Sequence, residues 1–192
     1  MSGFSTLFPL QNSRTHEVCG ANATAFAFAL AGQTGGGVMW ISESWQGEHI
    51  NPMGFSTYMD PQDLLLTKVT DQAQGLGVAE ETLRSGAVSL MVIELTNPLS
   101  FTVGRRLQLA AETGQSTGLC IIPEGMGNNA AQTRWRCSSL YDPADSTLQR
   151  WEIIKNKSGT LMSWDVRWDA QTRRINVVSE TAQREGSARA PR

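Results

Sequence analysis

The sequence predicts an α/β fold, in which a mostly parallel central sheet flanked by helices is followed by a C-terminal antiparallel β-meander. Two observations lead to this prediction. Through the first two thirds of the chain, short apolar segments alternate with helical patterns, which is typical of βαβ units and therefore of parallel strands. In the last third, apolar and polar residues alternate along 162–169, as they do in antiparallel strands with one buried face.

The parallel part opens with a buried strand at 16–20 and a helix over 22–33. This helix is apolar on nearly every side, so we expect other parts of the protein to cover it on both faces. Three glycines at 35–37 end it and lead into the next apolar strand. Asp71 is expected to cap a later helix, and Gly86 to stop it. The remaining elements expected here are strands at 38–42, 64–69, 90–95 and 119–122, a short helix at 51–59, and helices over 71–85 and 98–114.

The last third is expected to form four strands, at 133–140, 149–154, 162–168 and 174–178, after a flexible loop over 124–132. The chain is then expected to divide into an N-terminal arm (1–15), one α/β domain (16–178) and a disordered tail (179–192) of small and charged residues. A length of 192 residues is enough for one domain with a sizeable core.

Composition is that of an ordinary soluble protein, with 40% apolar and 18% charged residues. The chain has no apolar run long enough for a membrane span, and its first residues lack the features of an export signal, so we expect a cytoplasmic protein. Cys19, Cys120 and Cys137 lie in apolar settings and are expected to be buried thiols.

Charge is distributed unevenly along the chain. Residues 1–132 carry five basic and eleven acidic groups, whereas residues 133–178 carry eight basic and five acidic ones. Contact with phosphates or with an acidic partner is therefore expected through the C-terminal third. The excess is small for a dedicated DNA-binding protein.

A degenerate phosphate-binding loop joins the first strand to the first helix. The pattern of such loops is G-x-x-x-x-G-K-[ST]. Gly20 holds its first position, but Ala25, Phe26 and Ala27 stand where the second glycine, the lysine and the hydroxyl belong. Those three groups allow close backbone approach, contact the β/γ oxygens and bind magnesium. The sequence therefore predicts no enzyme activity and no cofactor, and it predicts that Phe26 packs where a nucleotide would otherwise lie.

Glu94 ends the apolar strand at 90–95, where folds with a phosphate loop carry a metal-binding acid. Because Ala27 replaces the loop hydroxyl, Glu94 lacks the second group that would bind a metal ion together with it. It is therefore interpreted either as a vestigial metal-acid position or as a solvated carboxylate at the edge of the sheet. His16 and His49 have no neighbouring ligands at metal spacing, so no metal site is expected.

Lys155 and Lys157 lie directly after the strand at 149–154, in the sequence Lys-Asn-Lys-Ser-Gly. One interpretation is a hairpin turn, for which Asn, Ser and Gly are common. The other is a pair of ammonium groups presented to a partner at a subunit interface. The residues alone leave both interpretations open.

Taken together, residues 16–178 resemble the ATPase core of RecA-type recombinases. The segment 83–94 is similar to the family's helix end and metal-acid strand, with Glu94 in place of the usual Asp. Residues 124–132 fall where the family has its second DNA-binding loop, but this loop is much shorter here. The lysine pair is shared, and in the recombinases these lysines reach the nucleotide of a neighbouring filament subunit. The resemblance thus implies a RecA-like fold and a partner or filament contact for Lys155 and Lys157.

More closely, the chain resembles the ImuA-type family of RecA-like accessory proteins of bacterial SOS mutagenesis. The similar pieces are 16–18, 38–41, 51–54, 83–88, 106–112 and 151–168. The resemblance implies a role in DNA repair, in error-prone translesion synthesis after DNA damage. The implied partners are ImuB, an inactive Y-family polymerase that binds the sliding clamp, then an error-prone C-family polymerase reached indirectly, and RecA itself.

The expected function is that of a pseudo-ATPase that works through protein–protein contacts. Two alternatives remain open. One is a weak nucleotide-binding ATPase or sensor with an altered site, and the other is a DNA-binding module that uses the basic C-terminal third.

Overall fold

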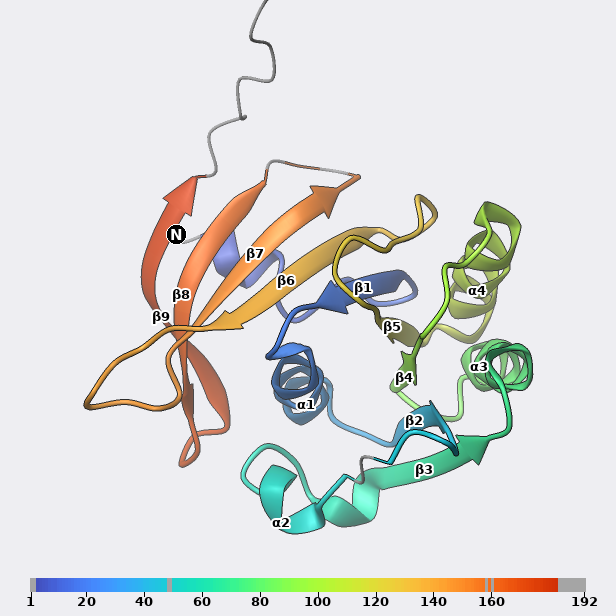
Figure 1. The fold of residues 1–192 in the computed structure, drawn as a ribbon, viewed down its shortest axis with the longest axis horizontal. Coiled ribbons are helices and arrows are strands. Elements are labelled where there is room, and N and C mark those ends of the chain that lie inside the picture. Colours follow the sequence, from blue (N-terminus) through green and yellow to red (C-terminus); the bar gives the residue numbers. More distant parts are fainter. Residues whose placement is uncertain (1–2, 48–49, 158, 160, 183–192) are drawn as a thin grey trace, which may run out of the picture.

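One mixed sheet runs through the protein and supports its other elements (Figure 1). The computed structural model describes residues 3–47, 50–157, 159 and 161–182. In this part of the chain, nine strands form the sheet in the order β3-β2-β4-β5-β1-β6-β7-β8-β9. The strands are β1 (Thr15–Cys19), β2 (Val38–Glu43), β3 (Leu64–Val69), β4 (Leu90–Glu94), β5 (Thr117–Ile121), β6 (Thr133–Ser139), β7 (Gln149–Asn156), β8 (Met162–Asp169) and β9 (Arg174–Ala182). The helices are α1 (Ala23–Thr34), α2 (Pro52–Phe55), α3 (Gln72–Ser85) and α4 (Phe101–Gly114), with short 3-10 turns η1 (Gly3–Thr6) and η2 (Pro61–Asp63).

The strands from β3 to β6 are parallel, and those from β6 to β9 are antiparallel. The predicted α/β fold, with a parallel sheet followed by an antiparallel meander, is therefore confirmed. β6 belongs to both parts, because it pairs in parallel with β1 and antiparallel with β7. The sequence pattern placed it in the meander alone, since periodicity along one segment says nothing about a partner more than a hundred residues away.

Helix α1 lies on one face of the sheet, and α3 and α4 cover the other face (Figure 1). The meander curves so that β6 and β9 also contact α1. This cover explains why α1 is apolar on nearly every side, and Phe26, Ala27 and Leu30 are fully buried in it. Most of α1 is therefore covered, as expected, although at its start Thr24 is exposed and Ala25 is half-buried.

The N-terminal segment, predicted as a lead-in arm, is part of the core. Phe4, Phe8 and Leu10 are all buried there. The ring of Phe8 lies 5.0 Å from that of Trp151 in β7, and the ring of Phe4 lies 5.4 Å from that of Trp164 in β8. The segment has no regular period because it packs through single aromatic side chains rather than through one face of a helix or strand.

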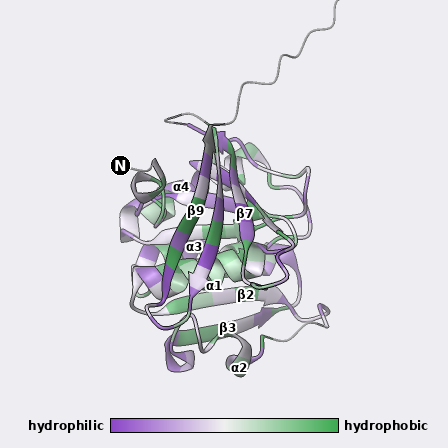
Figure 2. Cartoon of the chain, turned by 90° about the vertical axis from the view of Figure 1, so that its left-hand side faces the viewer, coloured by the Kyte–Doolittle hydropathy of each residue, from purple (hydrophilic) through white to green (hydrophobic). Residues whose placement is uncertain are grey.

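The last strand extends further than the sequence predicted. β9 reaches Ala182, so the start of the tail at residue 179 was placed four residues too early. Ser179 and Glu180 pair with β8, and the hydroxyl of Ser179 donates to Asp165 at 2.9 Å. Figure 2 shows hydrophilic and hydrophobic residues alternating along β9. The small polar residues at the end of β9 are held by backbone pairing with β8, which composition does not show. The rest of the predicted tail, residues 183–192, lies outside the described part.

The three cysteines are free and buried, as predicted. Burial raises the pKa of each thiol above its ordinary value, so they behave as small apolar side chains. Among the helices of the described chain, none is long and apolar enough to cross a membrane.

Candidate functional site

A cleft of about 680 Å³ opens at the carboxyl edge of the parallel sheet. Its lining residues come from the start of α1, the ends of β4 and β5, and the segment around α2. In open α/β sheets, ligands bind beyond the carboxyl ends of the strands, and a volume of this order is typical of small-molecule sites. We refer to it as the carboxyl-edge cleft and take it as the candidate site.

The turn between β1 and α1 is closed by the backbone of β6. Gly20 has a φ of 95°, and a Cβ at this position would lie only 2.3 Å from the carbonyl oxygen of Cys137. The N–H of Asn22 donates to that same carbonyl at 3.2 Å, and the N–H of Ala23 donates to the carbonyl of Gly20 at 3.1 Å. A phosphate cradle needs such N–H groups turned toward the ligand. In this loop two of them are used inside the protein.

The three substituted positions of the degenerate loop all lie within α1. Ala25 lines the carboxyl-edge cleft, whereas Phe26 and Ala27 face the core. The ring of Phe26 lies 4.6 Å from that of Trp151 and 5.4 Å from that of Trp135. The expectation that Phe26 fills the place of a nucleotide is therefore wrong. The helix begins at Ala23, and this turns the side chain of Phe26 toward β6 and β7 instead of the cleft.

Glu94 lies at the end of β4 and lines the cleft, half-buried. Its Oε1 accepts a hydrogen bond of 2.6 Å from the indole Nε1 of Trp40, which is buried in β2. The carboxylate is therefore not simply solvated, because it satisfies a buried donor. Its second oxygen carries the remaining acceptor capacity on this wall.

Aromatic and amide side chains that the sequence did not single out complete the cleft. Phe28, Phe55 and Tyr58 form one wall, and the rings of Phe28 and Phe55 stack with centroids 4.8 Å apart. Gln46 also lines the cleft, and its Oε1 is buried without a hydrogen-bond partner among the described residues. Glu94 is the only charged side chain among the described residues that line the cleft. No sequence motif points to these residues, because they converge from three separate segments: α1, the loop after β2, and the region of α2.

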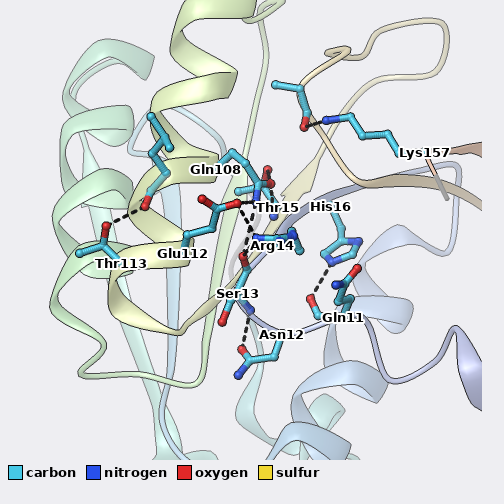
Figure 3. Close-up of polar contacts among 12 residues, drawn as sticks. Gln11, Asn12, Ser13, Arg14, Thr15, His16, Gln108, Glu112, Thr113 and Lys157 are labelled. Carbon is cyan, nitrogen blue, oxygen red and sulfur yellow. Dashed lines mark hydrogen bonds and ion pairs between the residues drawn. The ribbon is translucent and has the colours of Figure 1, made fainter.

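Lys155 and Lys157 lie at the opposite edge of the sheet. β7 runs antiparallel to β6, so its end lies beside Thr133 and Arg134 at the start of β6. Both ammonium groups donate to backbone carbonyls of the loop before β6. Lys155 donates to Asn129, at 3.2 Å, and to Ala131. Lys157 donates to Ala130 at 2.6 Å (Figure 3). Burial, with the nearby charge of Lys157, lowers the pKa of Lys155 to about 8.

The structure therefore separates the two groups of predicted site residues. Gly20, Ala25 and Glu94 lie at or beside the carboxyl-edge cleft, and the lysines lie at the amino edge. Lys155 belongs to β7 itself, so only Lys157 lies beyond the strand, in the connection to β8. His49, set aside as a metal ligand, lies outside the described residues.

The loop over 124–132, predicted to be flexible, is fastened to a buried charge pair. Arg134 donates to Oε2 of Glu17 at 2.8 Å, and the backbone N–H of Asn128 donates to the other carboxylate oxygen at 2.6 Å. The Asn128 side chain in turn donates to the carbonyls of Leu99 and Ser100. The polar, glycine-containing sequence of this loop predicted mobility. Its anchoring partners could not be recognised from that sequence, because they lie far away along the chain.

His16 lies beside this pair and is itself fully enclosed. Its Nε2 lies 2.9 Å from the carbonyl oxygen of Gln11 (Figure 3). Its Nδ1 lies 2.7 Å from the hydroxyl of Thr133. Burial is the main reason that the pKa of His16 falls to about 4, with the charges of Arg14 and Lys155 acting in the same direction. The imidazole is thus a neutral part of the core.

Most basic groups of the C-terminal third have partners within the protein. The ion pairs of this region are Arg134–Glu17, Arg136–Glu152, Arg150–Asp165 and Arg167 with Asp142 and Asp145. Together with the two lysines on loop carbonyls, these pairs reduce the positive charge offered to a nucleic acid.

Comparisons with protein-family models and with curated protein sequences find no match to this chain.

Proposed function

We propose that this protein is a non-catalytic, RecA-like accessory protein of SOS-induced error-prone translesion synthesis, which acts through protein–protein contacts. One observation supports it above the others. In the turn that would bind a phosphate, two N–H groups donate to the carbonyls of Cys137 and Gly20, while two lysines lie at the opposite edge of the sheet. We infer that the turn no longer holds a triphosphate. Lys155 and Lys157 donate to loop carbonyls, but each ammonium has three N–H donors, and a neighbour's acceptors could share or replace these carbonyls.

The residues at the phosphate-loop and metal-acid positions lack the groups that phosphoryl transfer needs. Gly20 alone survives from the phosphate-loop pattern, and Glu94, at the metal-acid position, is engaged by Trp40. Phosphoryl transfer depends on a lysine and a metal ion that neutralise the developing charge. Phe26, which replaces the lysine, is buried away from the cleft and offers no charge.

The separation of the two edges suits a head-to-tail contact. Such contacts join two different surfaces of neighbouring subunits. In the recombinases that the sequence resembles, the lysine pair reaches a nucleotide held by the next subunit. A subunit that offers Lys155 and Lys157 but cannot hold a nucleotide of its own would bind one end of a RecA filament and stop its growth. The other proposed partners are an ImuB-like inactive Y-family polymerase and, through it, an error-prone C-family polymerase.

The test is binding to nucleotide-bound RecA filaments, measured with the wild-type chain and with Lys155→Ala/Lys157→Ala. We expect the double variant to bind at least about tenfold more weakly, since two charge-assisted contacts are lost. Arg105→Ala/Arg174→Ala removes two exposed positive charges elsewhere and serves as the matched control. Unfolding curves of both variants separate lost contacts from lost structure. Unchanged binding of the lysine variant would contradict the proposed contact of Lys155 and Lys157 with the filament.

The volume of the carboxyl-edge cleft favours one second candidate, a nucleotide sensor that does not hydrolyse. Calorimetry with ATP and magnesium distinguishes it. Heat of binding at millimolar nucleotide would support a nucleotide sensor, and a titration without heat would exclude this candidate function. DNA binding through the C-terminal third is less favoured, because its arginines are largely paired.

A further inference from the structure

The chemistry of the carboxyl-edge cleft points to a ligand of the opposite charge to a phosphate. We propose that it receives the guanidinium group of an arginine side chain from a partner protein. This inference rests on the proposed function in one respect only, that the protein works by contacting other proteins.

Charge is the first argument. Among the described residues that line the cleft, Glu94 alone is charged. The indole of Trp40 occupies Oε1 at 2.6 Å, and a carboxylate has about four lone-pair sites in all. Oε2 is therefore available to a cationic donor. A phosphate brought to the same wall would meet a negative charge with no described lysine, arginine or histidine lining the cleft to offset it.

A second, independent observation is the orphan acceptor of Gln46. Its Oε1 is buried and finds no donor in the described part of the protein. A buried acceptor without a donor is destabilising, so a bound group with several N–H donors would relieve a penalty already present. Guanidinium carries five such donors in a planar fork, more than any other side chain. An ammonium group has three, directed from a single point.

The aromatic wall supplies the third argument. Phe28, Phe55 and Tyr58 line the same cleft as Glu94. Phe28 already stacks with Trp40 and Phe55, and Tyr58 stacks with Trp168. This wall therefore offers an apolar surface for the aliphatic stem of an arginine rather than a free ring face. The volume of about 680 Å³ also leaves room for the aliphatic stem and for adjoining residues of the partner.

The start of α1 is the feature that would favour an anion instead. Helix N-termini carry partial positive charge. Here the N–H of Asn22 donates to Cys137 and that of Ala23 donates to Gly20, so this end is partly neutralised from within. The Oδ1 of Asn22 also accepts from the hydroxyl of Ser139 at 2.8 Å instead of capping the helix. Glu94 therefore sets the charge preference of the cleft.

The test uses the full chain and small capped probes, followed by the NMR signal of the Trp40 indole N–H, which is assigned with Trp40→Phe. N-acetyl-arginine methylamide should shift this signal saturably in the millimolar range. N-acetyl-citrulline methylamide has the same shape without the charge and should bind at least about tenfold more weakly. Glu94→Gln keeps an acceptor for Trp40 and should reduce arginine-probe binding to the level of citrulline. Gln46→Met should weaken it less.

Three results would overturn the proposal. Equal binding of the arginine and citrulline probes would show that charge plays no part, and equal binding of N-acetyl-lysine methylamide would remove the role of guanidinium. Tighter binding of free arginine than of the capped probe would identify a small-molecule site instead of a protein-docking one. Since no RecA or polymerase is present in this experiment, its failure is distinct from a failure of the filament contact.

Discussion

The indole Nε1 of Trp40 donates a 2.6 Å hydrogen bond to Oε1 of Glu94, and this bond links the middle of β2 to the end of β4. Trp40 is 1% exposed, so its N–H has no access to water. The carboxylate of Glu94 therefore satisfies a buried donor. Through this bond it helps to hold two neighbouring strands together.

Glu94→Ala is expected to destabilise the protein by about 1–2 kcal/mol, because it leaves the Trp40 indole buried without an acceptor. Glu94→Gln keeps an oxygen at the same place and should cost less than about 1 kcal/mol. Urea denaturation of the two variants measures the difference. Equal losses would mean that the amide oxygen of Gln does not replace the carboxylate, and that the charge of Glu94 rather than its hydrogen bond to Trp40 carries the stability.

Phe26→Lys is expected to destabilise by more than about 3 kcal/mol and to leave ATP binding undetectable by calorimetry. The substitution removes a fully buried ring and forces an ammonium group among Phe8, Trp135 and Trp151. Phe26→Leu keeps the site apolar and should cost about 1–2 kcal/mol. ATP binding by Phe26→Lys without loss of stability would contradict the orientation of α1 described above.

The strands of the parallel sheet could be predicted from sequence because each is a short apolar run between turn signals. The strand at 64–69 was placed on its observed limits. The order of the strands could not be predicted, since no local pattern states that β1 lies between β5 and β6. For the same reason the loop over 124–132 was predicted to be flexible. Its anchor on Glu17 lies 111 residues from Asn128 along the chain.

The candidate site was predictable only in part. The loop residues and Glu94 follow a known pattern, so their place at the carboxyl edge follows from the βαβ order. Trp40, Gln46 and the aromatic wall carry no motif, and they meet only because α2 lies near the start of α1. The inward orientation of Phe26 depends on where the helix begins, which sequence rules place only to within a residue or two.

Stability should fall as the pH is lowered from about 6.5 to about 4, through the burial of His16. The carbonyl of Gln11 can only accept, so Nε2 carries the proton and Nδ1 accepts from the Thr133 hydroxyl. The folded pKa lies below the unfolded one, and the unfolded chain therefore binds more protons across this window. The loss in the free energy of unfolding is at most about 3 kcal/mol. In His16→Gln, the free energy of unfolding below pH 6.5 should lack this loss when compared with the same variant at pH 7. Parallel curves for both proteins would show that other groups cause the effect.

Arg134→Met should be among the most damaging single substitutions of a charged residue, at about 3–5 kcal/mol. The Glu17 side chain is 3% exposed, and without Arg134 it is left as a buried carboxylate with only the N–H of Asn128 as a described donor. Arg150→Met is the matched control, because it breaks an exposed pair with Asp165 by the same change and should cost less than about 1 kcal/mol. Adding Glu17→Gln to Arg134→Met removes the unpaired charge and should recover part of the loss in denaturant unfolding. Similar costs for the two arginine variants would mean that the pair at β1 and β6 is solvated, and that the loop over 124–132 is held by the Asn128 side chain alone.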